Sequence, residues 1–417
     1  MKIRKFISLT CLLFALSVNC IPAQESIRFE HLKYDEIIEK SKQEKKPVLI
    51  YFTGTGCFLC VKMEKNVFPK PEISQFYNTN FINVESFDDF KKPDSATKQL
   101  RRRYGIISNP TFIFTDSTGT IIHKSGYKET EQFLLTGKQA ISNDNYKVWK
   151  EKIDAGYADA SLMLNYLSAE QKPALYANDN YNCMAQIALD RYFDMIPEKD
   201  YVLPQNWRII ENYVANPFSK IFTYLLEHQP LFDQQNGHER VNKAIYTILR
   251  EGLMINEDEA HRKRAELLVN SSNHPMSALV QKIRTLNNTD LNKAINDKKQ
   301  IAYMTLQYDS LMNHYSYLLP ALQVNNFVRN LCESAAKINT DILNKCNKWM
   351  SLIISKPENQ DYDYYDTYAL SCFLTNNFKE AVQAQEKSIA LAVQDKLDSE
   401  ELLPYKKALE KYQKALQ

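Results

Sequence analysis

YFTGTGCFLC, residues 51–60, is the stretch from which the fold of the first part of this chain can be predicted. The apolar run from Pro47 to Phe52 predicts a short buried strand, and the glycines after it predict a turn. The two cysteines then begin an amphipathic segment, which predicts a helix that ends near Asn66. The sequence therefore places a Cys-x-x-Cys pair at the junction of a strand and a helix.

This position has a chemical consequence for the two thiols. Unpaired backbone N–H groups and the helix dipole favour a thiolate at a helix N-terminus, so we expect a lowered pKa for Cys57. Cys60 lies one turn further on the same face, where it can attack a mixed disulfide and release the partner. Zinc sites use the same spacing, but they need two more ligands, for which the sequence offers no obvious source. The position of the pair between a strand and a helix favours redox chemistry over zinc binding.

The residues around this stretch predict alternating helices and strands. Periodicity, prolines and glycines give the order helix, strand, helix, helix, strand, helix, strand, strand, helix. The expected ranges are 32–45, 47–52, 57–66, 72–78, 81–84, 96–104, 111–115, 120–124 and 129–141.

In this order and in its motifs, the segment from about residue 30 to 142 resembles the thioredoxin superfamily. Residues 57–60 match the redox motif, residues 104–111 (YGIISNPT) match the segment that leads into the family's proline, and Gly126 matches the glycine after the last strand. Residues 60–68 are most similar to exported thioredoxin-like domains related to the C-terminal domain of DsbD-type disulfide reductases. The resemblance implies an α/β domain with a central mixed sheet flanked by helices.

The resemblance also assigns roles to individual residues. In the family the proline that corresponds to Pro110 is cis and lies beside the cysteine pair. The backbone of the residue before it, here Asn109, pairs with the substrate main chain. Phe58 and Leu59 make the surroundings of the sulfurs apolar, and we count them among the substrate-binding residues. The two cysteines of the motif are expected to form a disulfide when oxidised.

Two positions depart from the family pattern. Gly56 stands where thioredoxins commonly carry tryptophan. Tyr51 stands where they carry a buried aspartate that helps to deprotonate the deeper thiol, and a tyrosine cannot do so near neutral pH. Glu64, one turn beyond Cys60 on the same face, is our candidate catalytic replacement. The alternative is a solvated glutamate paired with a neighbouring lysine, and the sequence favours neither.

The helix expected over residues 96–104 carries three consecutive arginines, Arg101-Arg102-Arg103, near its end. Basic runs are usually a solvated face, and three positive charges at a helix C-terminus suit the helix dipole. We therefore assign them no partner.

The first 23 residues predict a signal peptide. Residues 1–23 combine a basic start, an apolar run and small residues before a cleavage point, and the run is too short for a membrane span. Cys20 raises the alternative of a lipidated anchor, but Asn19 before it suits that processing poorly. We expect a soluble protein in the periplasm or otherwise exported.

Length and charge limit the remaining choices. A chain of 417 residues predicts two or three structural units. Loss of residues 1–23 removes three of its 52 basic residues and none of its 50 acidic ones, which leaves a net charge of 49 − 50 = −1. This balance gives no electrostatic reason to expect nucleic-acid or membrane binding. No glycine-rich phosphate loop, nucleophile-elbow serine or metal-binding cluster is found, so we expect no cofactor and no metal.

The rest of the chain predicts a second, all-α domain. We place the α/β domain at residues 24–142 and a solenoid of helical hairpins at 143–417. Residues 362–394 resemble one tetratricopeptide repeat, and residues 403–416 would cap the stack. Such stacks commonly bind peptides or proteins, but bracing of the first domain or self-association is an equal alternative. The expected helices before this repeat are 146–157, 160–167, 184–195, 207–213, 241–253, 257–270, 276–286, 319–338 and 341–354.

Four cysteines lie in this helical region. We expect Cys183, Cys332, Cys346 and Cys372 to be buried core residues, as isolated cysteines on apolar helix faces usually are. A disulfide between Cys332 and Cys346 across one hairpin is the alternative.

Together these features predict an exported protein-disulfide oxidoreductase, whose cysteines carry two electrons without a dissociable cofactor. Its expected partners are client proteins with thiols or disulfides, selected by the helical region, and a membrane electron donor or acceptor of the DsbD type. The direction of electron flow stays open. The alternative is a non-enzymatic binding or assembly protein with a structural Cys57–Cys60 disulfide, which the departures at Tyr51 and Gly56 favour slightly.

Overall fold

The computed structural model describes residues 26–89, 91–92, 94–170, 181–254, 263, 266 and 274–417. The expected signal peptide, Cys20, the side chain of Cys183 and most of the helix expected over 257–270 lie outside the part of the chain that is described. The chain divides into two compact units, and the boundary along the sequence lies between Asn236 and Gly237. No helix in the described ranges is both long and apolar enough to cross a membrane.

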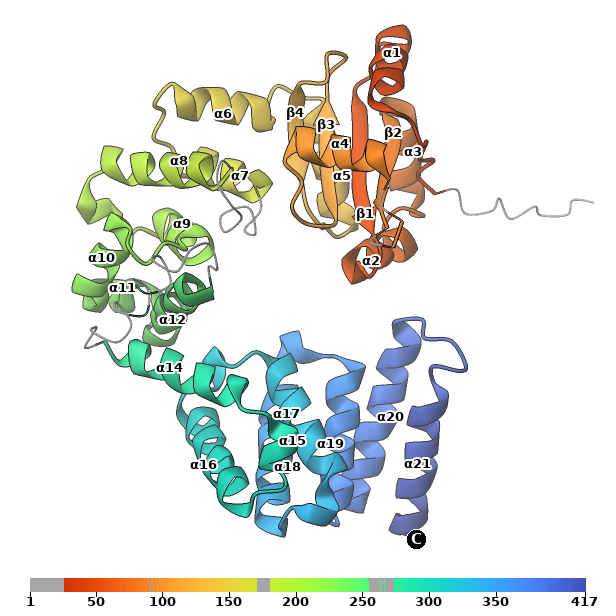
Figure 1. The fold of residues 1–417 in the computed structure, drawn as a ribbon, viewed down its shortest axis with the longest axis vertical. Coiled ribbons are helices and arrows are strands. Elements are labelled where there is room, and N and C mark those ends of the chain that lie inside the picture. Colours follow the sequence, from red (N-terminus) through yellow and green to blue (C-terminus); the bar gives the residue numbers. More distant parts are fainter. Residues whose placement is uncertain are drawn as a thin grey trace, which may run out of the picture. The chain divides into compact units, whose positions relative to one another are not determined.

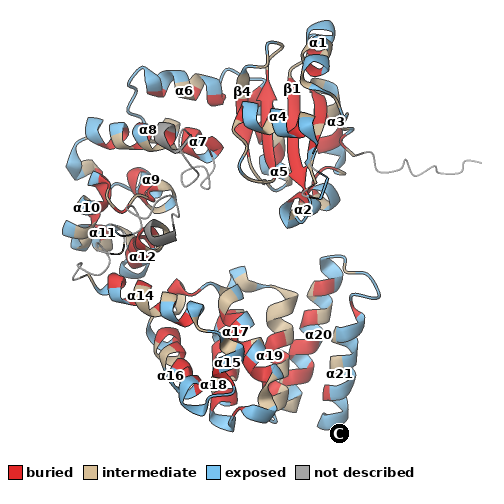
Figure 2. Ribbon diagram, in the orientation of Figure 1, coloured by how far each residue is buried: buried red, intermediate tan, exposed pale blue. Residues whose placement is uncertain are grey.

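The first unit contains a four-stranded mixed sheet with the strand order β2-β1-β3-β4 (Figure 1). Central strand β1 (Val48–Gly54) runs parallel to β2 (Ile82–Asp88) and antiparallel to β3 (Thr111–Thr115). Strand β3 pairs in turn with the antiparallel edge strand β4 (Ile121–Ser125). Every residue of β1 is buried, as expected for a continuous apolar run in a sheet that is covered on both faces (Figure 2).

Alternation along β1 divides the core between the two faces of the sheet. The flanking helices are α1 (Tyr34–Glu44), α2 (Phe58–Asn66), α3 (Pro71–Asn80), α4 (Ser95–Tyr104) and α5 (Thr130–Ala140). Leu49 and Tyr51 belong to an aromatic-rich cluster with residues of α2, α3 and α5, whereas Ile50 and Phe52 pack in a second cluster with residues of α1 and α4. The sequence thus predicts both the sheet and its flanking helices.

Strand β2 is longer than the sequence predicts. The expected range ended at residue 84, but parallel pairing with β1 continues from Glu85 opposite Tyr51 to Asp88 opposite Gly54. The added residues are mostly polar, so no apolar pattern indicated them, and it is the hydrogen bonding to β1 that keeps them extended. The extension carries Asp88 to the level of the turn before Cys57.

Two helices after residue 142 pack against β4 (Figure 1). They are α6 (Tyr146–Asp154) and α7 (Ala160–Glu170). Lys124 of β4 forms a buried ion pair with Glu170, and the Tyr146 hydroxyl donates a hydrogen bond of 2.6 Å to the same carboxylate. Burial lowers the pKa of His123 to about 4, so its neutral ring can accept the Tyr146 backbone N–H at 3.1 Å. A division between two domains at residue 142 stays a prediction.

The described residues beyond α7 form helices, as expected. The first unit ends with α8 (Tyr181–Met195), η2 (Glu198–Asp200), α9 (Pro204–Tyr213), α10 (Lys220–Glu227) and α11 (Gln229–Asn236). The second unit contains α12 (His238–Met254), α14 (Pro275–Asn288), α15 (Leu291–Ala294), α16 (Lys298–His314), η3 (Ser316–Leu318), α17 (Ala321–Glu333), η4 (Ala335–Lys337), α18 (Thr340–Ile354), η5 (Pro357–Asn359), α19 (Tyr362–Leu374), α20 (Phe378–Gln394) and α21 (Leu403–Leu416).

Some of these helices were not expected from the sequence, notably α10, α11 and α16. In α16 the buried residues Ile301, Met304, Tyr308 and Leu311 do recur at helical spacing. The exposed apolar residues Tyr303 and Leu306 lie between them, so the apolar stripe is hard to recognise in the sequence.

Helices α19 and α20 pack closely, as the repeat-like pattern predicts. Ala369, Ala381 and Ser388 are fully buried, and the Ser388 hydroxyl donates a hydrogen bond of 2.7 Å to the backbone oxygen of Tyr362. The resemblance to a tetratricopeptide repeat stays a prediction.

Three cysteines of the second unit are buried free thiols, as expected: Cys332, Cys346 and Cys372. The alternative disulfide between Cys332 and Cys346 is not formed. Instead, a hydrogen bond with Cys332 and burial together raise the pKa of the Cys346 thiol well above its ordinary value.

We expect Glu170→Gln to lower the free energy of unfolding by about 3 kcal/mol, because it leaves Lys124 as a buried cation without its carboxylate. Urea denaturation followed by circular dichroism measures this loss. The double variant Lys124→Met/Glu170→Leu should recover most of it. A single variant as stable as the wild type would contradict the structural role of this ion pair.

Candidate active site

The two cysteines occupy different environments at the start of α2. Cys57 is the N-cap residue of the helix, and its sulfur accepts the backbone N–H of Cys60 at 3.2 Å. Cys57 is partly exposed, whereas Cys60 is only 1% exposed and belongs to the core. The two residues form a disulfide with their Cα atoms 5.2 Å apart. One sulfur can therefore be approached from solvent while the other lies beneath it.

Glycine is required in the turn that leads to Cys57. Gly56 has φ +77, a left-handed conformation that L-residues with side chains rarely adopt. This backbone conformation explains why a glycine stands where the family commonly has tryptophan. Gly54 is a glycine for a steric reason, because a Cβ atom there would lie 2.7 Å from the Asp88 backbone oxygen.

The structure brings residues 105–110, which we call the proline loop, to the end of β1 near this turn. The Asn109–Pro110 peptide bond is cis, as the resemblance implied, and Pro110 is buried. The next residue, Thr111, pairs with Phe52 in the sheet. The residue before the proline is also close to the turn, because a Cβ on Gly54 would lie 3.0 Å from the side-chain nitrogen of Asn109. Residues far apart in the sequence thus meet close to the cysteine turn.

Glu64 has a partner that the sequence did not indicate. The hydroxyl of Tyr51 donates a hydrogen bond of 2.9 Å to the Glu64 carboxylate. Tyr51 is fully buried and stacks on Phe112, and burial raises the pKa of its phenol far above the ordinary value. The phenol is therefore a hydrogen-bond donor and no base at neutral pH. Whether Glu64 acts on the Cys60 thiol stays a prediction.

Exposed apolar side chains lie on the elements that carry the site. Phe58 is 76% exposed and Leu59 is 40% exposed, immediately after Cys57. Three comparable residues were not expected from the sequence, namely Val61 in α2, Phe87 near the end of β2 and Ile107 before the proline. No local pattern distinguished them from core residues, because their exposure depends on the tertiary packing.

Arg101 and Asp88 were also missed. The guanidinium of Arg101 donates a hydrogen bond of 2.9 Å to the side-chain oxygen of Asn109 and lies 3.5 Å from the carboxylate of Asp88. The expectation of a solvated basic run is thus wrong for Arg101, because its side chain turns inward and is only 16% exposed.

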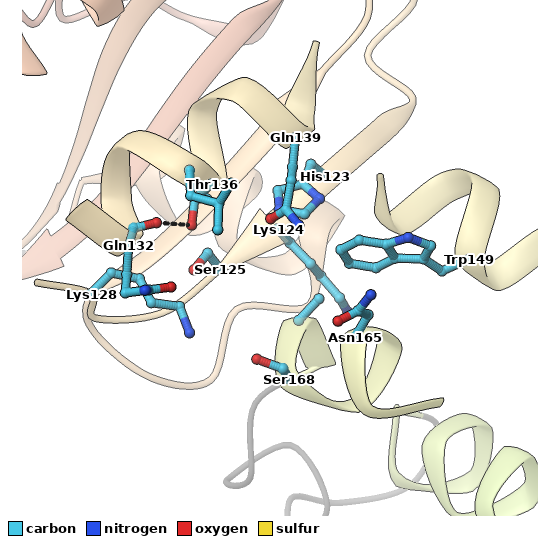
Figure 3. A pocket seen from close by; sticks show the side chains of 12 residues that line it. His123, Lys124, Ser125, Lys128, Gln132, Thr136, Gln139, Trp149, Asn165 and Ser168 are labelled. Atoms are coloured by element: carbon cyan, nitrogen blue, oxygen red, sulfur yellow. Dashed lines mark hydrogen bonds between the residues drawn. The ribbon is translucent and has the colours of Figure 1, made fainter. Parts of the chain in front are cut away.

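A cavity of about 170 Å³ lies elsewhere in the first unit, between β4, α5 and the helices α6 and α7 (Figure 3). Its lining includes Lys124, Lys128, Trp149 and Asn165, but neither of the two motif cysteines nor Pro110. Within the described residues, no three His, Cys, Asp or Glu side chains gather in a way that could hold a metal ion.

Residues 34–141 match the family model of the thioredoxin-like domain. The disulfide bond reductase DsbH of Chlamydia pneumoniae is 27% identical over 103 residues, which cover 23% of this chain and 61% of that protein. The chain thus spans about 61% of the length of this curated relative.

Solved structures match a similar share of the chain. The DsbH oxidoreductase shares 23% identity, with 29% of this chain and 88% of that chain covered and a TM-score of 0.26. The oxidised C-terminal domain of DsbD from Neisseria meningitidis shares 20% identity, with 25% and 89% covered and a TM-score of 0.23.

We expect Gly56→Ala to lower the free energy of unfolding by about 1 kcal/mol, because its Cβ disfavours the left-handed backbone. Thermal or urea unfolding measures the change. Thr55→Ala, at the exposed neighbouring position, is the matched control and should change stability by less than about 0.5 kcal/mol. Equal stability of the two variants would contradict the conformational requirement at Gly56.

Proposed function

The chain contains a thioredoxin-like domain, and from this premise we propose that the protein is an exported thiol–disulfide oxidoreductase that acts on client proteins. The observation that carries the proposal is the asymmetry of the cysteine pair. Cys57 is partly exposed at the start of a helix, and Cys60 is buried directly behind it. A structural disulfide does not need one accessible sulfur, whereas disulfide exchange does.

Exchange begins with the reduced pair. The Cys60 N–H and the N-terminus of α2 stabilise a thiolate on Cys57. This thiolate attacks a client disulfide, so that a mixed disulfide forms and one client thiolate leaves. The Cys60 thiolate then attacks the Cys57 sulfur, the Cys57–Cys60 disulfide forms, and the second client thiolate leaves. The client gains two electrons, and the reverse sequence oxidises a dithiol client.

Clients would bind along the proline loop. We assign the main-chain pairing to Asn109 beside Pro110, and the contacts around the scissile disulfide to Phe58 and Leu59. Because these two apolar side chains are exposed, clients with apolar residues near their cysteines would bind best. A membrane electron donor or acceptor of the DsbD type would restore the pair, and the helical region would select the partner.

Glu64 is the proposed base for the second step. The Cys60 thiol must lose its proton before it attacks, and it is buried where no aspartate occupies the position of Tyr51. Glu64 lies four residues after Cys60 on the same helical face, and the Tyr51 hydroxyl fixes its carboxylate. Tyr51 thus acts as a positioning residue for a base on α2.

We expect Cys57→Ser to reduce the dithiothreitol-dependent reduction of insulin by at least about a hundredfold, because a serine hydroxyl is hardly ionised near neutral pH. Cys60→Ser should instead accumulate mixed disulfides, which non-reducing electrophoresis detects. Cys332→Ser, which changes a buried thiol outside the site, is the control. A wild-type protein that neither turns over nor has a reduction potential in the catalytic range would support the scaffold alternative.

We expect Glu64→Gln to slow the release of a client from the mixed disulfide by about tenfold or more, because the carboxylate no longer accepts the proton. Tyr51→Phe should have a smaller effect in the same direction, and the double variant should be no slower than Glu64→Gln. Stopped-flow measurement over a range of pH values gives these rates, with the exposed Glu72→Gln as control. Unchanged rates in Glu64→Gln would remove Glu64 from the mechanism.

A further inference from the structure

We propose that Arg101 is a positioning residue that sets the orientation of the substrate-binding edge before Pro110, through the side chain of Asn109. The proposal deepens the proposed function and rests on it. It assigns to one arginine of the basic run a role in the binding of clients through their main chain.

The three consecutive arginines of α4 have three different surroundings. Successive residues of a helix point about 100° apart, so they cannot share one face. Arg102 is exposed, and its only described side-chain hydrogen bond is to the Lys98 backbone oxygen at 3.3 Å. Arg103 lies over the ring of Tyr34, 3.8 Å from its centre. Only Arg101 of the three turns towards the proline loop.

Arg101 bridges two elements of the site. Its Nη1 donates to the Asn109 Oδ1 at 2.9 Å, and its Nε lies 3.5 Å from the Asp88 carboxylate. Burial lowers the pKa of the guanidinium, and the charge of Asp88 opposes this shift. A partly desolvated guanidinium is stable where its planar group meets acceptors on both sides, which a lysine ammonium cannot reproduce.

Asp88 connects this bridge to the turn before the cysteines. It is the last residue of β2, it pairs with Gly54, and its backbone oxygen accepts the Thr55 N–H at 3.0 Å. The side-chain nitrogen of Asn109 lies on the same side of Gly54, where a single Cβ would come within 3.0 Å of it and 2.7 Å of the Asp88 backbone oxygen. The contacts thus form a closed loop from the turn through Asp88, Arg101 and Asn109 and back to the turn.

This arrangement fixes one residue in particular. Asn109 is held at its side-chain oxygen by Arg101 and has little free space on the side of Gly54. Its backbone, in turn, leads directly into the cis bond to Pro110. Without the guanidinium, the Asn109 side chain can rotate, and the edge offered to a client is no longer held in one orientation. Clients that pair through their main chain would then bind more weakly, while the sulfurs keep their positions.

The test compares two disulfides as substrates of the full chain. One is a peptide closed by a disulfide, which has a main chain to pair with Asn109 and is reduced in steady state with dithiothreitol as the electron donor. The other is 5,5′-dithiobis(2-nitrobenzoate), which has none; it reacts in a single turnover with the pre-reduced chain after removal of dithiothreitol, which would reduce it directly. We expect Arg101→Met to raise the KM for the peptide about tenfold, as loss of a charged hydrogen bond would, with kcat changed less than about twofold. Its reaction with the aromatic disulfide should change less than about twofold.

Two matched variants separate positioning from folding. Arg102→Met, on the same helix, should leave both reactions unchanged. Arg101→Lys keeps the charge opposite Asp88 but not the planar fork, so it should show most of the defect with the peptide while its melting temperature stays close to that of the wild type. In an Asn109→Ala background, Arg101→Met should cause no further loss with the peptide.

The outcomes are distinguishable. If Arg101→Met slowed the reactions with both disulfides equally, the positioning role would be overturned and general destabilisation indicated. The same holds if the effects of Arg101→Met and Asn109→Ala on peptide reduction were additive. No change with the peptide would overturn it as well. A wild-type protein that reduces neither disulfide would overturn the proposed function itself, and this inference with it.

Discussion

The hydrogen bond from the Cys60 N–H to the Cys57 sulfur is the interaction on which the site depends. It makes Cys57 the cap of α2, so one sulfur lies at the positive end of the helix while the other enters the core. The bond forms only because the turn ends where the helix begins, and that turn needs Gly56 in a left-handed conformation. Strand, turn and helix therefore act as one unit, around which the proline loop, Asp88 and Tyr51 are arranged.

Local sequence was enough to predict the parts of this unit. The apolar run of β1, the glycines and the cysteine spacing predicted the strand, turn and helix, and the resemblance led from Pro110 to a cis bond. Side-chain pairs between distant elements could not be predicted. The Tyr51–Glu64 and Lys124–Glu170 contacts join residues that the sequence separates, and nothing in the arginine run marks Arg101 as the one that turns inward. Those contacts depend on how the elements pack.

The departures from the family pattern fit together in the structure. Tyr51 replaces a buried acid, and its ring stacks on Phe112 and meets Phe68 edge to face. A buried carboxylate would be costly in this apolar cluster, whereas a phenol needs only one hydrogen-bond partner. Glu64 supplies that partner from the helix, close to solvent. The Tyr51 phenol is thus satisfied by an acceptor on the helix surface, four residues after the deeper cysteine.

The packing of α6 and α7 on β4 bears on how this protein can be divided. A fragment that stops at residue 142 would lack Tyr146 and Glu170, and with them the carboxylate that pairs with Lys124 and the backbone N–H that the His123 ring accepts. It would also lack Trp149, whose ring packs edge to face on His123, and so would expose the apolar surface that Trp149 covers. The packing of these two helices on β4 therefore gives a physical reason to keep residues 143–170 with the thioredoxin-like domain when the chain is divided.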